Sequence, residues 1–61
     1  MIGEMLLYSP QESAELLGIS RSQMFELLAC GDVESVKIGR LRKIPREALT
    51  AYVERLRALP A

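Results

Sequence analysis

The sequence predicts a mainly α-helical fold with one small β-hairpin, in the order helix, helix, hairpin, helix. Three observations predict this order. Two helix-start signals lie close together before Gly31, an alternating apolar pattern surrounds Gly39-Arg40, and apolar residues with helical spacing follow Pro45. The 61 residues suffice for one domain, residues 1–61, and the 49% apolar and 26% charged fractions are ordinary for a globular protein.

The first helix is expected over residues 10–17. Ser9 can accept a hydrogen bond at the helix start, proline suits the first helical position, and Glu12 stands where a capping box needs a carboxylate. Gly18 can adopt the left-handed conformation that ends a helix. Ahead of this helix, the apolar residues 5–8 either add a short extended segment or fold back onto the core.

The second helix is expected over residues 21–30. Ser20 and Gln23 repeat the capping-box spacing, and Gly31 provides the stop. Because only residues 18–20 connect the two helices, they must meet at a sharp angle.

A β-hairpin is expected next. Alternation over residues 33–38 predicts a strand with Val36 and Ile38 on one face. Gly39-Arg40 fits a two-residue turn of type II′, which requires glycine first, and the return strand covers residues 41–44.

The third helix is expected to open at Pro45-Arg46-Glu47 and to stop before Pro60. Its apolar residues recur with helical spacing, at Leu49, Tyr52, Val53 and Leu56.

The first two helices match the requirements of a helix-turn-helix DNA reader. Such a unit needs a small residue where the helices cross, a turn glycine and apolar anchors around both helices. Ala14 is the small residue and Gly18 the turn glycine. The expected anchors are Leu17, Ile19, Met24 and Leu27.

The outer side of the second helix carries side chains that can read DNA. Arginine pairs with guanine, glutamine with adenine, and serine with a base or a phosphate. Phe25 either touches a thymine methyl or covers the edge of the core, and Glu26 either accepts from a cytosine or is a solvated charge that repels phosphate. The candidate residues of this helix are Ser20, Arg21, Ser22, Gln23, Phe25 and Glu26.

Net charge is zero, with eight basic and eight acidic residues, but the charges are segregated. Residues 1–34 hold one arginine and six acidic residues, whereas residues 35–46 hold five basic residues and no acid. Alone, this basic run fits a solvated loop, but beside a reading helix it predicts a wing that grips the DNA backbone or enters the minor groove. Its expected DNA contacts are Lys37, Gly39, Arg40, Arg42 and Lys43, with Arg46 at the start of the third helix as a backbone contact.

The faces of the hairpin qualify this expectation. Lys37, Arg40 and Lys43 are placed on its exposed side or tip, whereas Arg42 shares a face with Ile44 by the period of two. The Arg42 stem can cover the core while its guanidinium reaches out.

Other classes of protein find little support. The chain has no histidine, no carboxylate pair in a credible cleft and no glycine-rich phosphate loop, so we expect no enzyme and no cofactor or metal. Cys30 alone can form no internal disulfide. No signal peptide or membrane span is recognised, no small-molecule effector is expected, and we expect a cytoplasmic, nucleoid-associated protein encoded by a bacterium or phage.

The ordered set of LYSPQESAELLGISRS over residues 7–22, VKIGR over 36–40 and IPREAL over 44–49 resembles the excisionase-type winged helix-turn-helix family, relatives of the MerR DNA-binding domain. The resemblance covers about residues 6–57. It implies that the second helix enters the major groove while the wing contacts the adjacent backbone. This chain departs from the family at Glu26, Ala29-Cys30 and Arg42, which puts its base preference in doubt.

Three functions remain open at this point. The first is an excisionase, or recombination directionality factor, that binds and bends attachment-site DNA to help a tyrosine-type integrase, with cooperative self-association on tandem sites. The second is a small MerR-like transcriptional regulator. The third is a protein-interaction module using either residues 1–8 or the C-terminal helix.

Overall fold

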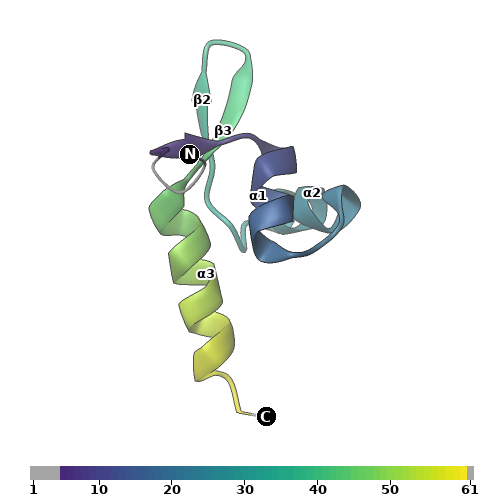
Figure 1. Ribbon diagram of the computed structural model, residues 1–61, viewed down its shortest axis with the longest axis vertical. Helices are drawn as coiled ribbons and strands as arrows, with labels where there is room; N and C mark the ends of the chain where they lie inside the picture. Colours follow the sequence, from purple (N-terminus) through teal and green to yellow (C-terminus); the bar gives the residue numbers. More distant parts are fainter. Residues whose placement is uncertain (1–4, 61) are drawn as a thin grey trace.

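The computed structural model describes residues 5–60 and has the expected order of elements (Figure 1). Two short helices lie to one side of a projecting hairpin, and a longer helix leads away from the hairpin base. The fold is a winged helix-turn-helix, as the sequence predicts. The elements are β1 (Leu7–Tyr8), α1 (Pro10–Leu17), α2 (Arg21–Cys30), β2 (Val36–Ile38), β3 (Leu41–Pro45) and α3 (Arg46–Ala58).

Both helix starts are complete capping boxes. The Ser9 hydroxyl oxygen accepts from the Glu12 backbone N–H at 3.1 Å, and the Glu12 carboxylate accepts from the Ser9 backbone N–H at 2.9 Å. Ser20 and Gln23 make the same reciprocal pair at the start of α2. Gly18, with φ of 73°, ends α1 in the left-handed conformation and lets α2 turn away at once.

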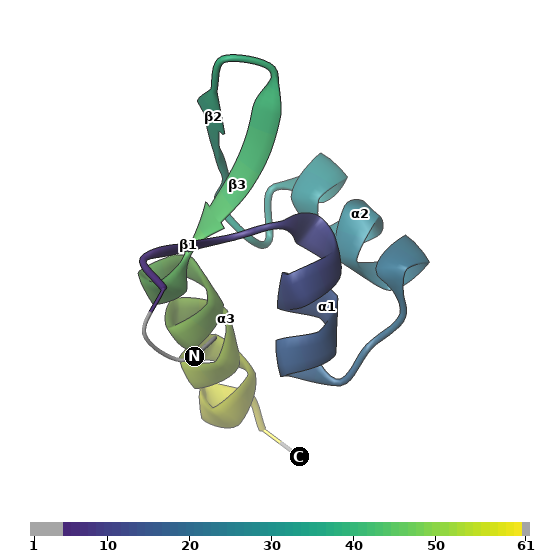
Figure 2. The same ribbon diagram turned by 45° about the horizontal axis from the view of Figure 1, so that its top comes forward.

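A short strand at residues 7–8 completes a three-stranded antiparallel sheet in the order β1-β3-β2. Tyr8 pairs with Ile44, and the Arg46 backbone N–H donates to the Leu6 carbonyl at 3.0 Å. Residues 7–8, for which the sequence allowed either an extended segment or a segment folded back onto the core, therefore form a strand. It ties the start of the described chain to the junction of β3 and α3 (Figure 2).

The hairpin is shorter on one side than expected. The strand predicted over residues 33–38 begins only at Val36. Val33 is instead a core residue, 2% exposed, whose N–H donates to the Leu27 carbonyl at 3.3 Å, so it belongs to the loop that follows α2. Gly39 has φ of 61° and no other described residue of the turn has positive φ, which agrees with the expected type II′ turn.

The third helix follows β3 without a loop. Pro45 is both the last residue of the strand and the N-cap of α3, so the helix begins at Arg46 rather than at Pro45. Pro60 stands two positions beyond its end at Ala58. None of the helices in the described part of the chain is long and apolar enough to cross a membrane.

One core joins all three helices to the sheet. The expected core of the helix-turn-helix unit is confirmed. The small residue Ala14 and the anchor Met24 are buried. The anchors Leu17, Ile19 and Leu27 are half-buried and pack against the core cluster. The buried hydrophobic residues are Tyr8, Ala14, Met24, Leu28, Val33, Ile44 and Leu49. The apolar row of α3 is covered only at its start, since Val53 and Leu56 remain 37% and 49% exposed.

The second half of α3 has a separate attachment. The Arg55 guanidinium donates to the carbonyl oxygen of Asp32 in the loop after α2 and lies 5.9 Å from the Tyr52 ring centroid. This contact holds α3 beside the α2–β2 loop where the core itself does not reach.

The α1 capping box makes stability dependent on pH. The hydrogen bond from the Ser9 N–H, helped by the Ser9 hydroxyl and by the charge of Lys43, lowers the pKa of Glu12 below its ordinary value of 4.5. The contribution of the ionised Glu12 carboxylate to the free energy of unfolding is therefore complete above pH 4.5 and is lost as pH falls through the lowered pKa. We expect Glu12→Gln to destabilise the protein at neutral pH and to lose this deficit in acid.

Urea denaturation of wild type and Glu12→Gln at about pH 7 and about pH 3 measures this difference. Glu15→Gln, on the exposed side of the same helix, is the matched control. An equal stability gap between wild type and Glu12→Gln at both pH values would contradict the assignment.

Candidate nucleic-acid interface

The two sides of α2 differ sharply in solvent exposure. Met24 is fully buried and Leu28 is 8% exposed, so these residues fix the inward side of the helix. The outward side agrees with the sequence-based assignment. Its exposed residues are Arg21, Ser22, Phe25, Glu26 and Ala29.

Arg21 and Phe25 form a pair on the outward side. The Arg21 guanidinium carbon lies 5.4 Å from the centroid of the Phe25 ring, one helical turn away. Phe25 is 41% exposed, so it lies on the outer surface and does not seal the core edge. The ring supports the guanidinium at the N-terminal end of α2, where backbone N–H groups and the helix dipole favour an anion.

Ser20 and Gln23 are exposed but already engaged. The Gln23 side-chain oxygen accepts from the Ser20 backbone N–H at 3.1 Å and from the Ser20 hydroxyl at 3.3 Å. A glutamine reads adenine through both its oxygen and its amide nitrogen. Here the oxygen is used to begin the helix, so these two candidates hold the recognition helix in place, and their predicted DNA contact stays a prediction.

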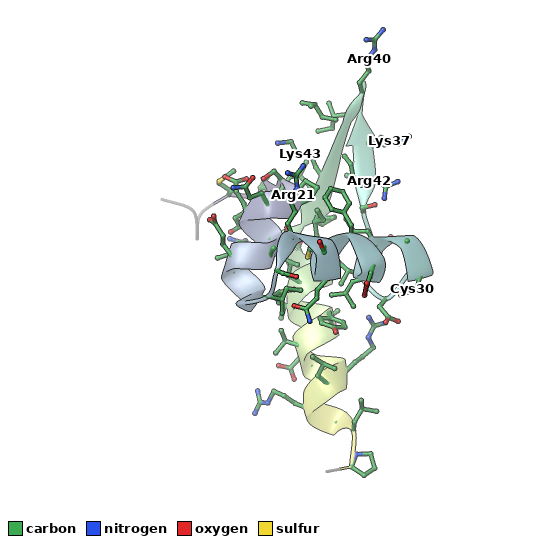
Figure 3. The ribbon with its side chains drawn as sticks, turned by 90° about the vertical axis from the view of Figure 1, so that its right-hand side faces the viewer. Arg21, Cys30, Lys37, Arg40, Arg42 and Lys43 are labelled. Carbon is green, nitrogen blue, oxygen red and sulfur yellow. The ribbon has the colours of Figure 1, made fainter. Side chains whose placement is uncertain are left out.

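The hairpin register separates the basic residues between two faces. Lys37 pairs with Arg42, whereas Lys43 pairs with Val36. Cross-strand partners share a face, so Lys37 and Arg42 lie on one side and Lys43 on the other. The placement of Lys37 and Lys43 together on one exposed side is thus corrected, because they stand an even number of residues apart across a two-residue turn. Figure 3 shows the two groups on opposite sides of the hairpin.

Lys43 is also less available than its neighbours. Its side chain is half-buried at the base of the wing, and its charge contributes to the lowered pKa of Glu12. Arg40, in contrast, occupies the tip of the wing and projects away from the rest of the protein (Figure 3). The expected basic residues of the wing therefore lie on two faces and at the tip of the hairpin, with Arg40 as the outermost charge.

Arg46 stands apart from this surface. It begins α3 and lines a groove with Tyr8 and residues of α1, and no residue of α2 or of the hairpin lines that groove. Its expected contact with the DNA backbone stays a prediction.

The wing also has an exposed apolar surface that was not predicted from the sequence. Val36, Ile38 and Leu41 share the face of Lys43 and are 40%, 55% and 60% exposed. The alternation placed Val36 and Ile38 on one face, but that face is exposed along the hairpin, and Ile44, which reaches the core, lies on the opposite face with Lys37 and Arg42. Among the described residues no group of three or more His, Cys, Asp or Glu side chains is placed to hold a metal ion.

A sharply connected pair of helices, an exposed second helix and a basic hairpin beside it define a DNA-binding domain of the winged helix-turn-helix class. Comparison with known protein families agrees with this class. The chain belongs to the helix-turn-helix domain family, whose model matches residues 7–57.

The chain is similar to two curated proteins. A protein named "Probable excisionase" from Saccharopolyspora erythraea is 47% identical over 51 residues, which cover 84% of this chain and 52% of that protein. "Magnetosome protein MamR" from Magnetospirillum gryphiswaldense is 35% identical over 49 residues, which cover 80% of this chain and 58% of that protein. The chain thus spans little more than half the length of either relative.

We expect Arg21→Ala to weaken binding to a specific DNA site by about 1–3 kcal/mol, because one base or phosphate contact at the start of α2 is lost. Phe25→Leu, which removes only the support of the guanidinium, should cost about 0.5–1 kcal/mol. Fluorescence anisotropy with a labelled duplex measures both. Arg57→Ala is the control, because Arg57 lies near the far end of α3 and pairs with Glu54 at 3.5 Å. Equal losses for Arg21→Ala and Arg57→Ala would exclude a special role for Arg21.

Proposed function

We propose that this domain acts as an excisionase, which binds attachment-site DNA, bends it and so helps a tyrosine-type integrase to excise a mobile element. The observation that carries the proposal is the joint surface of α2 and the wing, with Arg21 at one end and Arg40 at the other. The 47% identity to a protein named as a probable excisionase supports it.

The geometry suits a two-part contact with DNA. The outer face of α2 enters the major groove, while the wing reaches the neighbouring backbone or minor groove with Arg40 in front. Ile38 and Leu41 flank the turn and are exposed. Apolar side chains pressed against or between base steps favour bending, so these two residues give the wing a means to deform DNA.

A domain of this size has limited affinity by itself. Single DNA-binding modules bury a small interface, and the acidic first half of this chain reduces non-specific attraction. Cooperative binding of several copies to tandem sites, together with contacts to the integrase, supplies the remaining affinity.

A small MerR-like transcriptional regulator is the second candidate. The same α2 and wing surface serves a promoter as well as an attachment site. The relative named as a magnetosome protein is 35% identical to this chain and its name does not refer to excision, which favours keeping this candidate.

The proposal is tested by measuring affinity for attachment-site DNA and for random DNA of equal length across a salt series. If about four phosphates are contacted, the slope of log affinity against log salt is about −3.6. Arg40→Ala should lower the magnitude of this slope by about 0.9, because one phosphate contact is lost. Arg57→Ala, an exposed arginine of α3, should leave the slope unchanged.

A circular-permutation gel and an integrase-dependent excision assay then separate the two candidates. An excisionase bends the attachment site and raises the yield of excised product. Specific binding to a promoter without any effect on excision would favour the regulator, and affinity that ignores salt and DNA sequence would exclude both.

A further inference from the structure

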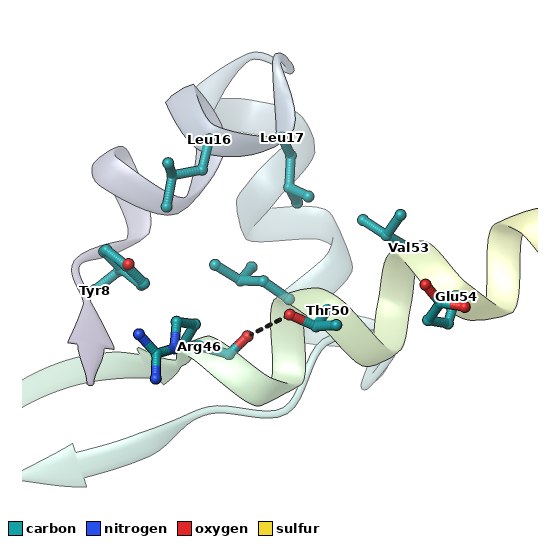
Figure 4. Close-up of a pocket in the computed structure, with 8 residues that line it drawn as sticks. Tyr8, Leu16, Leu17, Arg46, Thr50, Val53 and Glu54 are labelled. Atoms are coloured by element: carbon teal, nitrogen blue, oxygen red, sulfur yellow. Dashed lines mark hydrogen bonds between the residues drawn. The ribbon is translucent and has the colours of Figure 1, made fainter. Parts of the chain in front are cut away.

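Two hollows lie along opposite sides of α3. One is the groove towards α1, which has Val53 and Glu54 on its α3 wall (Figure 4). The other has a volume of about 290 Å³ and lies where Tyr52 and Arg55 of α3 meet Asp32 of the loop between α2 and β2. The second hollow therefore places the far half of α3 beside the segment that joins the recognition helix to the wing.

Arg55 bridges the second hollow. Its guanidinium donates to the backbone carbonyl oxygen of Asp32, which stands 23 positions earlier in the sequence. The guanidinium carbon also lies 5.9 Å from the centroid of the Tyr52 ring, and Tyr52 packs against the core cluster. Because the core supports the ring and the ring supports the guanidinium, the loop is tied to the core at Asp32.

The α2–β2 loop, residues 31–35, has two further attachments on either side of Asp32. The Gly31 N–H donates to the Leu28 carbonyl at 3.4 Å and ends α2. The Val33 N–H donates to the Leu27 carbonyl at 3.3 Å, and the Val33 side chain is buried in the core. Arg55 holds the residue between these two from the side of α3, so the end of α2 is fixed by the core on one side and by α3 on the other.

The strand that follows this loop has no support of its own from the core. The core cluster includes Ile44 of β3 but no residue of β2, all of which the structure describes. All three residues of β2, Val36–Ile38, are exposed, and the middle one is the wing cation Lys37. The position of β2 thus depends on its pairing with β3 and on the loop that leads into it.

We propose that Arg55 is a positioning residue for DNA binding. From α3 it holds the α2–β2 loop, and through the loop it orders the end of the recognition helix and the start of the wing, without touching DNA. This role rests on the proposed contact of α2 and the wing with DNA. A segment that is ordered before binding loses less conformational entropy in the complex, so the brace raises affinity without adding a contact.

Three variants separate this role from others. Arg55→Met removes the donor but keeps an unbranched side chain over the Tyr52 ring, and methionine has nearly the same helix propensity as arginine. Arg55→Lys keeps a charged donor. Arg57→Met, the same substitution two positions further along α3, is the matched control, because Arg57 is exposed and pairs with Glu54 at 3.5 Å. Circular dichroism gives a temperature at which all variants are folded.

Amide hydrogen exchange measures the loop without DNA. Exchange at Val33 should be about threefold to tenfold faster in Arg55→Met than in wild type, because the loop opens more often. Exchange at Ile19, whose N–H donates to the Ala14 carbonyl at 3.0 Å, should change little, and Arg57→Met should match wild type at both amides. Unchanged exchange at Val33, or equal acceleration at Val33 and Ile19 through a general loss of stability, overturns the proposal.

Fluorescence anisotropy with an attachment-site duplex then measures affinity across a salt series. Arg55→Met should bind about threefold to tenfold more weakly than wild type with an unchanged slope of log affinity against log salt, because no phosphate contact is lost. Arg55→Lys should recover part of this loss, and Arg57→Met should bind as wild type does. A slope smaller in magnitude by about 0.9 would give Arg55 a direct phosphate contact and overturn the positioning role.

The two proposals fail in different ways. A wild type that binds no DNA would contradict the excisionase proposal and with it this role, although the exchange at Val33 would still show whether Arg55 holds the loop. A wild type that binds the duplex, together with an Arg55→Met variant that binds it equally well, would contradict the positioning role alone.

Discussion

The shared burial of Met24 and Ile44 is the constraint on which the structure depends. Both side chains are completely excluded from solvent, one in the recognition helix and the other at the base of the wing. They belong to a single cluster that also holds Tyr8 from β1 and Leu49 from α3. Because the three helices, β1 and β3 all contribute to this cluster, the position of α2 relative to β3 of the wing is set by packing rather than by the loop that joins α2 to the hairpin.

Local chemistry explains why the helices could be predicted from the sequence. A capping box involves residues three positions apart, and a left-handed stop needs only a glycine, so both ends of α1 and α2 are determined within a few residues. The apolar row of α3 and the alternation in β2 were equally visible. What periodicity could not show is whether another element covers the apolar side. Val53 and Ile38 have the spacing of core residues, yet both side chains lie beyond the edge of the core and remain exposed.

In the candidate site, too, the local features could be predicted from the sequence and the tertiary contacts could not. The outward residues of α2 follow from the inward direction of Met24, and the basic run identified the wing. The partners of individual side chains could not be foreseen, since they depend on tertiary geometry. Gln23 is engaged in a cap, the charge of Lys43 helps to lower the pKa of Glu12, and Arg46 lines a groove on another surface. Zero net charge thus conceals a concentrated cationic wing whose members differ in how freely they can reach a phosphate.

The direct passage from β3 into α3 has an energetic consequence for recognition. Pro45 is the last residue of β3 and the N-cap of α3, and its ring restricts the backbone at the junction. The same junction is held by the hydrogen bond from the Arg46 N–H to the Leu6 carbonyl. No loop therefore separates β3 of the wing from α3. The spacing of α2 and the wing is already set in the free protein, so the proposed DNA complex loses little conformational entropy when it forms, which offsets part of the limited affinity of a small interface.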